Sequence, residues 1–285
     1  MAPQLPDFDT FGAPAISGHH NPEQAVAASK AVLAADRLSD EPVIGPPPDT
    51  YVELEQGIQR DGEWLRTAEV RELNGEDEEA LARLGNNWPR KLDTIVMRGV
   101  RTVGEQFMSR QVCDELLMGD REALILAIRR ASFGDTVEFQ GLPCPHCGET
   151  TDLSLSLDDV PVVHLEDPTR TEYAVSLRKG ATAHVRLPAG KDQNAVLALK
   201  DANAAQQNSE ILRRCILRVE YPDGDVQRGS TALVRSMSMA DRQTILEFMS
   251  ATQPGPRFDQ ASFVHEPCGQ EVPLALRLPL LFRGL

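Results

Sequence analysis

Hydrophobic and polar residues alternate in two stretches that lie far apart in the sequence. The apolar positions are Val52, Leu54 and Ile58 in the first stretch and Tyr173, Val175 and Leu177 in the second. Apolar residues at alternate positions are typical of a β-strand with one buried face. Asp61-Gly62 follows the first stretch and Lys179-Gly180 the second, and both pairs favour a tight turn. Each stretch therefore predicts a β-hairpin.

Helical patterns follow the first hairpin. Asn74 is a candidate N-cap for a helix over residues 76–84, and a short helix is expected over residues 111–118. Asp120 precedes the most apolar helical run in the chain, residues 121–130. An aspartate in this position is a typical N-cap, so the pattern predicts that Asp120 caps this helix.

The second hairpin is followed by a similar series. Ser238-Met239-Ala240-Asp241 has the spacing of a capping box, which predicts a helix start. The helices expected in this half cover residues 192–203, 209–219 and 239–250.

The predicted elements have the same order in both halves of the chain. Gly75-Glu76-Asp77 corresponds to Gly190-Lys191-Asp192, and Asp120-Arg121 corresponds to Asp241-Arg242. Such internal similarity indicates a duplicated unit. The alternative is chance similarity between short helical motifs.

These patterns predict an α+β protein with two pseudo-symmetric repeats, each made of a β-hairpin, helices and a second hairpin. The apolar residues 278–282 are expected to pack on the second hairpins or to contact a partner. The predicted parts are an extended arm with one helix and a proline-rich linker (residues 1–50), the first repeat (51–157), a connector (158–171) and the second repeat with its tail (172–285).

Two short motifs carry candidate metal ligands. Cys144-Pro145-His146-Cys147-Gly148 and His265-Glu266-Pro267-Cys268-Gly269 each place two ligand side chains three residues apart and end in glycine. This spacing lets a tight turn direct both side chains at one ion, and the glycine accepts the positive φ of such a turn. Alternating leucines flank both motifs, so each is expected at the tip of a hairpin. Two such tips that clasp one ion form a zinc ribbon.

The four candidate ligands are Cys144, Cys147, His265 and Cys268, and one structural zinc per chain is expected. A Cys3His site has no open position for water, so the zinc is not expected to catalyse a reaction. In the alternative, His265 and Cys268 are an ordinary loop histidine and a buried thiol, and Cys144 and Cys147 form a redox pair. His146 is the substitute ligand if His265 is not one.

Composition narrows the function. The 285 residues carry a net charge of −14, which argues against nucleic-acid binding because phosphate recognition needs a basic surface. Five cysteines without an evident disulfide framework point to a reducing compartment. The N-terminus lacks the basic and apolar regions of a signal peptide, and the chain has no apolar run long enough to span a bilayer. A cytoplasmic place of synthesis is expected.

Motifs of common enzymes are absent from the sequence. We find no GxSxG, Walker, HExxH or dinucleotide-binding fingerprint. The remaining histidines, His19, His20, His164 and His184, are interpreted as ordinary surface groups. The sequence therefore predicts a protein that is not an enzyme.

Several segments resemble a known family. Residues 116–124 (Leu-Leu-Met-Gly-Asp-Arg-Glu-Ala-Leu), residues 127–134, the motif of residues 144–148 and the upstream residues 70–78 are similar to the T-even-type baseplate hub protein and assembly chaperone family. Its members belong to contractile phage tails and to phage-like contractile injection systems. The resemblance covers residues 50–157 well and the second repeat loosely. It implies a non-enzymatic baseplate component or assembly factor.

The leading hypothesis is therefore a structural or assembly protein of a contractile baseplate whose arm contacts neighbouring subunits. Its partners would be other baseplate or hub proteins, and no nucleic acid is expected among them. The protein would be cytoplasmic during assembly, and the finished particle could also contain it. The alternative is a zinc-ribbon adaptor in another multiprotein complex. The acidic residues around the two motifs argue against a nucleic-acid ribbon.

Overall fold

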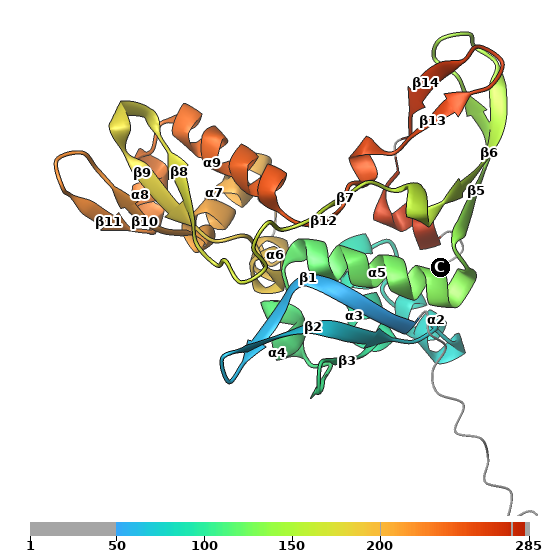
Figure 1. Ribbon diagram of the computed structural model, residues 1–285, viewed down its shortest axis with the longest axis horizontal. Helices are drawn as coiled ribbons and strands as arrows, with labels where there is room; N and C mark the ends of the chain where they lie inside the picture. The colour runs from blue at the N-terminus through green and yellow to red at the C-terminus, as the bar shows by residue number, and fades with distance from the viewer. Residues whose placement is uncertain (1–49, 200, 275, 283–285) are drawn as a thin grey trace, which may run out of the picture. The chain divides into compact units, whose positions relative to one another are not determined.

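The computed structural model describes residues 50–199, 201–274 and 276–282 (Figure 1). The described residues belong to one compact unit. The predicted arm, residues 1–50, lies outside the described residues apart from Thr50. The described part is a mixed α+β structure of short helices and small antiparallel sheets, which confirms the α+β part of the prediction.

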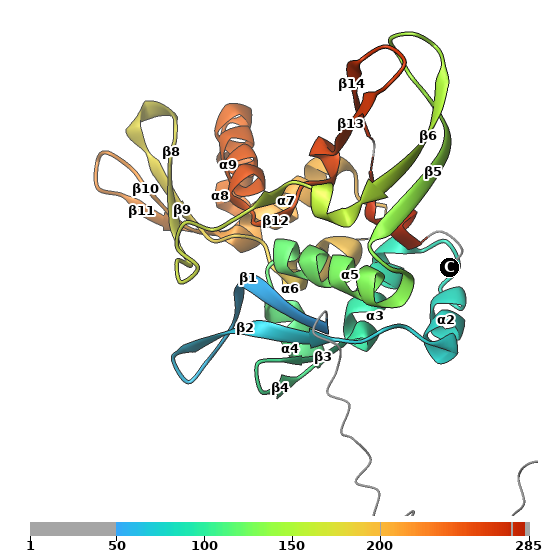
Figure 2. The same ribbon diagram turned by 45° about the vertical axis from the view of Figure 1, so that its right-hand side comes forward.

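The first half forms a four-stranded antiparallel sheet with helices packed against it. The strand order is β1-β2-β3-β4, with α5 packed against β1 and β2 (Figure 1) and β4 at the edge beside β3 (Figure 2). The predicted first hairpin is confirmed, with Asp61 and Gly62 at positive φ in its turn. The elements are β1 (Tyr51–Arg60), β2 (Glu63–Val70), α2 (Gly75–Ala82), α3 (Trp88–Gly99), β3 (Val100–Val103), β4 (Gln106–Phe107), α4 (Arg110–Glu115) and α5 (Met118–Phe133).

The second half forms another four-stranded antiparallel sheet, with the order β8-β9-β10-β11. The predicted second hairpin is confirmed, and a 3-10 turn over Arg178–Gly180 joins its strands. The elements are β8 (Tyr173–Ser176), β9 (Thr182–Val185), α6 (Gly190–Leu197), α7 (Ala204–Cys215), β10 (Ile216–Glu220), β11 (Val226–Arg228), α8 (Thr231–Ser236) and α9 (Met239–Thr252).

Each half continues into a two-stranded hairpin. Strands β5 (Thr136–Pro143) and β6 (Thr150–Ser156) follow α5, and strands β13 (Ser262–His265) and β14 (Gln270–Pro273) follow α9. A short pair, β7 (Val162–Val163) with β12 (Gly255–Pro256), links the segments that lead to and from the second half. The predicted connector thus contains a strand.

Two hydrophobic cores stabilise the described structure. The first includes Leu54, Ile95 and Leu124 from the first half and also side chains of the β5–β6 hairpin. The second is built by the second half, including Val185 and Ile245, but Leu117 from the first half also packs into it. Burial of these apolar side chains is the main favourable contribution to folding.

Asp120 is not a helix cap, contrary to the prediction. Helix α5 begins at Met118, and Asp120 lies within its first turn, where its side chain is fully buried. Its carboxylate accepts hydrogen bonds from the backbone N–H groups of Glu55, Gln56 and Gly57 in β1, at 2.7, 3.2 and 2.8 Å. The register of β1 against β2 shifts between Glu53 and Ile58, and this bulge turns the three N–H groups toward α5.

The helix predicted over residues 209–219 is also wrong in its bounds. Asn203 caps α7, which ends at Cys215, and the following residues form strand β10. Ile216 pairs with Val185 and Val219 with Ala183, so the apolar side chains of this stretch are buried through sheet pairing. Tertiary pairing overrides the helical pattern because these β-branched side chains fit a strand well.

The tail packs into the first core, which also contains side chains of the β5–β6 hairpin. Residues Leu278–Phe282 form a 3-10 helix, and Leu281 and Phe282 are buried in the first core. The Phe282 ring packs edge-on against Phe133 of α5, with centroids 6.2 Å apart. Arg129 Nε donates a 2.6 Å hydrogen bond to the Leu281 carbonyl oxygen. The tail therefore packs against α5 and is not a free contact strip.

Candidate metal centre

The first knuckle, residues 144–148, is the turn between β5 and β6. Its backbone is closed by a hydrogen bond from the Gly148 N–H to the Cys144 carbonyl oxygen, at 2.9 Å. Gly148 has a φ of +78°, as the sequence predicted for the residue after the second ligand. This conformation is accessible to glycine at little cost. The chain reversal leaves Cys144 buried and Cys147 exposed.

The second knuckle, residues 265–269, repeats this geometry between β13 and β14. The Gly269 N–H donates to the His265 carbonyl oxygen at 2.7 Å, and Gly269 has a φ of +66°. Both motifs therefore lie at the tips of hairpins, as the sequence predicted. The matched turns direct the two ligand side chains of each knuckle to the same side.

The four predicted ligand side chains come together. The ligand atoms of Cys144, Cys147, His265 and Cys268 all lie within 4.8 Å of one another. The Sγ atoms of Cys144 and Cys268 are 3.7 Å apart, and His265 Nδ1 lies 3.5 Å from Cys147 Sγ and 3.2 Å from Cys268 Sγ. This cluster joins residues that are 124 positions apart in the sequence.

These distances fit one tetrahedral ion. With Zn–S bonds of about 2.3 Å and a Zn–N bond of about 2.0 Å, tetrahedral angles place two sulfurs roughly 3.8 Å apart and nitrogen roughly 3.5 Å from sulfur. Three thiolates and one imidazole are also a soft donor set, typical of structural zinc. The cluster could therefore hold one metal ion, with all four positions filled by the protein.

His265 is not an ordinary loop histidine. Its side chain is fully buried, and Nδ1 faces the sulfur atoms of Cys147 and Cys268. Nε2 is buried without a hydrogen-bond partner among the described residues. Burial of an imidazole with one unpaired nitrogen costs free energy, which a bond from Nδ1 to a metal would offset.

The surroundings of Cys144 favour a thiolate. Burial by itself raises the pKa of this thiol, but the backbone N–H groups of Cys147 and His146 and the neighbouring thiols Cys268 and Cys147 hold the pKa below its usual value. A metal ligand must be deprotonated, so this environment is suited to ion binding.

The other cysteines and histidines lie outside the cluster. Cys113 and Cys215 are fully buried, as predicted, and burial raises the pKa of their thiols to about 11 and about 12. His146 is exposed at the first knuckle, whereas His164 Nδ1 lies 2.8 Å from Glu55 Oε1. His184 lies between Glu172 and Glu220. His19 and His20 lie outside the described residues.

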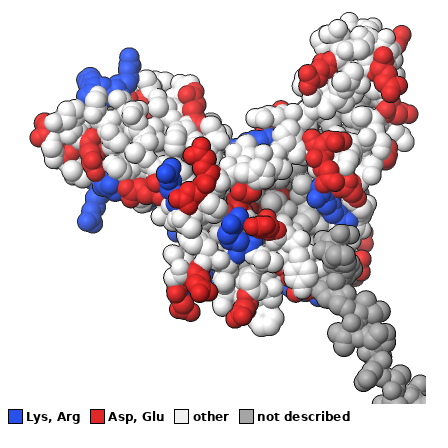
Figure 3. All heavy atoms as spheres, in the orientation of Figure 1, with Lys and Arg blue, Asp and Glu red and all other residues white. Residues whose placement is uncertain are grey.

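The surface around the hairpins is acidic. Glu149, Asp152, Glu266 and Glu271 are all exposed on or beside the two hairpins. Figure 3 shows Asp and Glu side chains over this part of the molecule. A surface of this charge repels phosphate groups.

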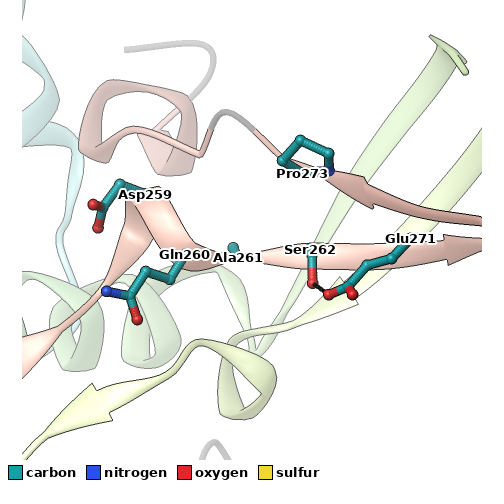
Figure 4. A pocket seen from close by; sticks show the side chains of 6 residues that line it. All are labelled: Asp259, Gln260, Ala261, Ser262, Glu271 and Pro273. Atoms are coloured by element: carbon teal, nitrogen blue, oxygen red, sulfur yellow. Dashed lines mark hydrogen bonds between the residues drawn. The ribbon is translucent and has the colours of Figure 1, made fainter. Parts of the chain in front are cut away.

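An open pocket lies beside β13 and β14 (Figure 4). Its lining includes the carboxylates of Asp259 and Glu271, and Ser262 Oγ donates a 2.5 Å hydrogen bond to Glu271. The six lining residues include no cation and no histidine. We assign it no chemistry.

Two helix-and-sheet units that extend into hairpins, with a Cys3His cluster at the hairpin tips, define an α+β protein with a candidate structural metal centre. The family model described as T4 bacteriophage base plate protein matches residues 64–276, and the chain belongs to this family. The match includes both knuckles. Searches of the curated proteins and of the solved structures found no match. No helix in the described ranges is long and apolar enough to cross a membrane.

Proposed function

We propose that this phage baseplate protein is a non-enzymatic structural or assembly component of a contractile tail or of a phage-like injection system. The family match over residues 64–276 is the observation that carries this proposal. It also favours the baseplate over the alternative of a zinc-ribbon adaptor in another complex. The proposed partners are other baseplate or hub proteins, met in the cytoplasm during assembly.

The proposed cofactor is one structural zinc ion, held by Cys144, Cys147, His265 and Cys268. The convergence of the four ligand atoms within 4.8 Å and the direction of His265 Nδ1 toward the sulfur atoms of Cys147 and Cys268 support this assignment. Zinc would join two hairpins that are distant in sequence. The zinc site would exist only in the folded chain, so the free energy of zinc binding would add to the stability of the fold. The bound ion would also close a long loop, which is entropically costly to close in the unfolded chain.

The two halves are proposed to be diverged copies of one unit. Both sheets follow the chain order of their strands without rearrangement, and both are followed by a pair of helices and a hairpin. The resulting proposed repeats cover residues 51–157 and 172–276.

A matching ion-pair cluster supports the duplication more specifically. In the first half, Arg71 and Arg98 both bind Asp77, at the start of α2. In the second half, Arg186 and Arg214 both bind Asp192 at 2.6 and 2.8 Å, at the start of α6. Both aspartates have no exposed side-chain area.

The backbone around each cluster also corresponds. The Arg71 N–H donates to the Gly99 carbonyl oxygen at 2.8 Å, and the Arg186 N–H donates to the Cys215 carbonyl oxygen at 3.0 Å. In both cases a residue at the end of the second strand contacts the end of the second helix. Equivalent side-chain and backbone contacts at the same topological position are much less expected from chance than a short sequence match.

The N-terminal arm, residues 1–50, is proposed to contact neighbouring subunits. The support is the sequence alone, since proline-rich segments without a periodic apolar pattern cannot bury a core of their own. The division into arm, first repeat, connector (158–171) and second repeat with tail (172–285) belongs to the same proposal.

Copurification with particles tests the baseplate role. Sheathed particles purified from cells that produce the tagged protein should contain it in a fixed ratio to the sheath subunit, or their assembly should fail when it is absent. A protein that is missing from particles and whose deletion leaves particle assembly intact would refute the role. Metal analysis of the same protein tests for about one zinc per chain.

A further inference from the structure

Within one chain, the first half binds the second through a defined contact. We call residues 114–119, where α4 turns into α5, the first corner, and residues 188–194, at the start of α6, the second docking segment. The contacts are Met118 N–H to the Pro188 oxygen (3.2 Å), Gly190 N–H to the Leu116 oxygen (2.9 Å), a β-bridge between Leu117 and Ala189, and Asn194 Nδ2 to Asp114 Oδ1 (2.7 Å).

Gly190 shows how close this contact is. A Cβ atom on Gly190 would lie 2.3 Å from the Cys113 carbonyl oxygen and 2.7 Å from Arg121 Nη1. Both distances are far below van der Waals contact, and Arg121 is itself buried. A glycine is therefore required where the first corner meets the first residue of α6.

The second half contains the same corner, but its surface is uncovered. Because Asp120 corresponds to Asp241, residues 114–119 of the first corner correspond to residues 235–240, where α8 turns into α9. We call these residues the second corner. Met239 is 87% exposed there, whereas the equivalent Met118 is half-buried. Ser238 is also exposed, whereas the equivalent Leu117 is 5% exposed. An exposed methionine beside other exposed residues is a typical contact position for a partner.

The first half contains the corresponding docking segment, also uncovered. By the correspondence of Asp77 with Asp192, the first docking segment is residues 73–79, and Gly75 corresponds to Gly190. Asn74 and Gly75 are exposed, and a Cβ on Gly75 would meet no described atom within 4 Å. No described atom therefore requires a glycine at position 75 on steric grounds.

The polar pair of the internal contact has a charged counterpart. Asp114 and Asn194 correspond to Arg235 and Glu79. Arg235 and Glu79 are both exposed, and they carry opposite charges. The described partner of Glu79 is Arg83, in an exposed pair that contributes little to stability. The second corner and the first docking segment are therefore complementary in charge as well as in position.

We propose that the second corner of one molecule binds the first docking segment of a second copy of this chain, in the manner of the internal contact. The proposal rests on the two-repeat organisation proposed above. Ser238 stands where the first corner has Leu117, and Asn74 where the second docking segment has Ala189, so the intermolecular contact is the more polar one. A head-to-tail contact of this kind builds a ring if its rotation closes and a filament if it does not.

Charge reversal tests the contact. Arg235→Glu and Glu79→Arg should each weaken self-association of the purified, metal-loaded full chain about ten-fold, measured by sedimentation velocity, because each places like charges opposite each other. An equal mixture of the two variants should associate as the unaltered protein does, since each interface in an alternating assembly again pairs Arg with Glu or Glu with Arg. The double variant should do the same.

Two charge reversals at exposed sites outside the contact serve as controls. Arg228→Glu and Glu63→Arg change the net charge by the same amounts and should leave association unchanged. A full chain that stays monomeric up to about 1 mM, where the association free energy would be weaker than about −4 kcal/mol, would overturn the proposal. An assembly that is insensitive to Arg235→Glu, or whose variants do not rescue each other, would overturn it as well.

The other possible occupant is the chain's own N-terminal segment. A monomer that associates only after removal of residues 1–49 would identify this segment as the occupant of the corner and overturn the proposal. These outcomes are separate from the baseplate role. A chain that is monomeric in solution but present in particles contradicts only self-docking, whereas one that self-associates but never enters particles contradicts only the baseplate role.

Discussion

The carboxylate of Asp120 accepts a 2.8 Å hydrogen bond from the backbone N–H of Gly57, which has a φ of +69° in the bulge of β1. A Cβ on Gly57 would lie 2.0 Å from the Leu65 carbonyl oxygen, so only glycine fits. Two further N–H groups of the bulge bind the same carboxylate. Asp120 therefore fixes the bend of β1 against the first turn of α5.

Asp120→Ala should lower the free energy of unfolding by roughly 3 kcal/mol or more, because three N–H groups of the bulge lose the acceptor that satisfies them. Urea denaturation measures this loss. The matched control is Asp241→Ala at the corresponding position of α9, where the carboxylate is only half-buried and accepts one long-range N–H bond, from Arg178. Its cost should be about 1 kcal/mol. Equal costs at the two sites would contradict this account.

Asp77 should make stability depend on acid. Burial opposes its ionised form, but Arg71, the Asn74 N–H and Arg98 lower its pKa from 3.8 to about 2. A folded-state pKa below the unfolded value stabilises the fold above pH 4, and this contribution is lost as the pH falls from about 4 to 2. By linkage it amounts to about 2 kcal/mol.

Asp77→Asn should therefore cost at least this amount at pH 7, and the difference from the unaltered protein should shrink between pH 4 and 2. The unfolding free energies of Asp77→Asn and of the unaltered protein are measured at several pH values. Acid affects the metal centre of both proteins, so this effect cancels in the difference between them. Glu63→Gln, at an exposed site outside the proposed contact, is the control and should show little effect. A difference that is constant from pH 7 to 2 would refute the role of the Asp77 carboxylate.

Removal of one metal ligand should release the ion. Cys144→Ser and Cys268→Ser are each expected to reduce bound zinc from about one per chain to near zero and to lower the melting temperature by about 10 °C or more. Cys215→Ser, a buried thiol outside the cluster, is the control and should retain zinc. Retention of full zinc by Cys268→Ser would show that the second knuckle does not complete the site.

Removal of residues 1–49 should separate assembly from stability. The described unit contains its own cores and the candidate metal centre, so zinc content and melting temperature should stay nearly unchanged. Incorporation into particles should fail if this segment contacts neighbouring subunits. A calorimetric melting curve together with particle copurification measures both. A large drop in melting temperature would instead place the segment in the folded core.

Local patterns in the sequence were sufficient for several features. The Asp61-Gly62 hairpin, the Asn74 cap and the two knuckles with their positive-φ glycines all depend on neighbours within a few residues. Turn geometry and capping are short-range effects, so residue type and spacing predict them well.

The tertiary structure decided the features that depend on distant partners. Asp120 has the local signature of a cap, yet its partners in β1 lie 63 to 65 residues away. Ile216 and Val219 follow a helical pattern but are recruited by β9, and Phe282 is buried against Phe133. Burial of apolar side chains and satisfaction of buried polar groups outweigh local propensity, because each contributes more free energy than a single capping or helix preference.

The candidate metal centre combines both kinds of information. Each knuckle is determined by a local spacing, but only the fold brings Cys144 to 3.7 Å from Cys268 across 124 positions. The same holds for the corners: the sequence contains two similar copies, while only the packed structure distinguishes the buried Leu117 from its exposed counterpart Ser238. Spacing fixes which groups can act together locally, and long-range packing determines which of them meet and which remain available to a partner.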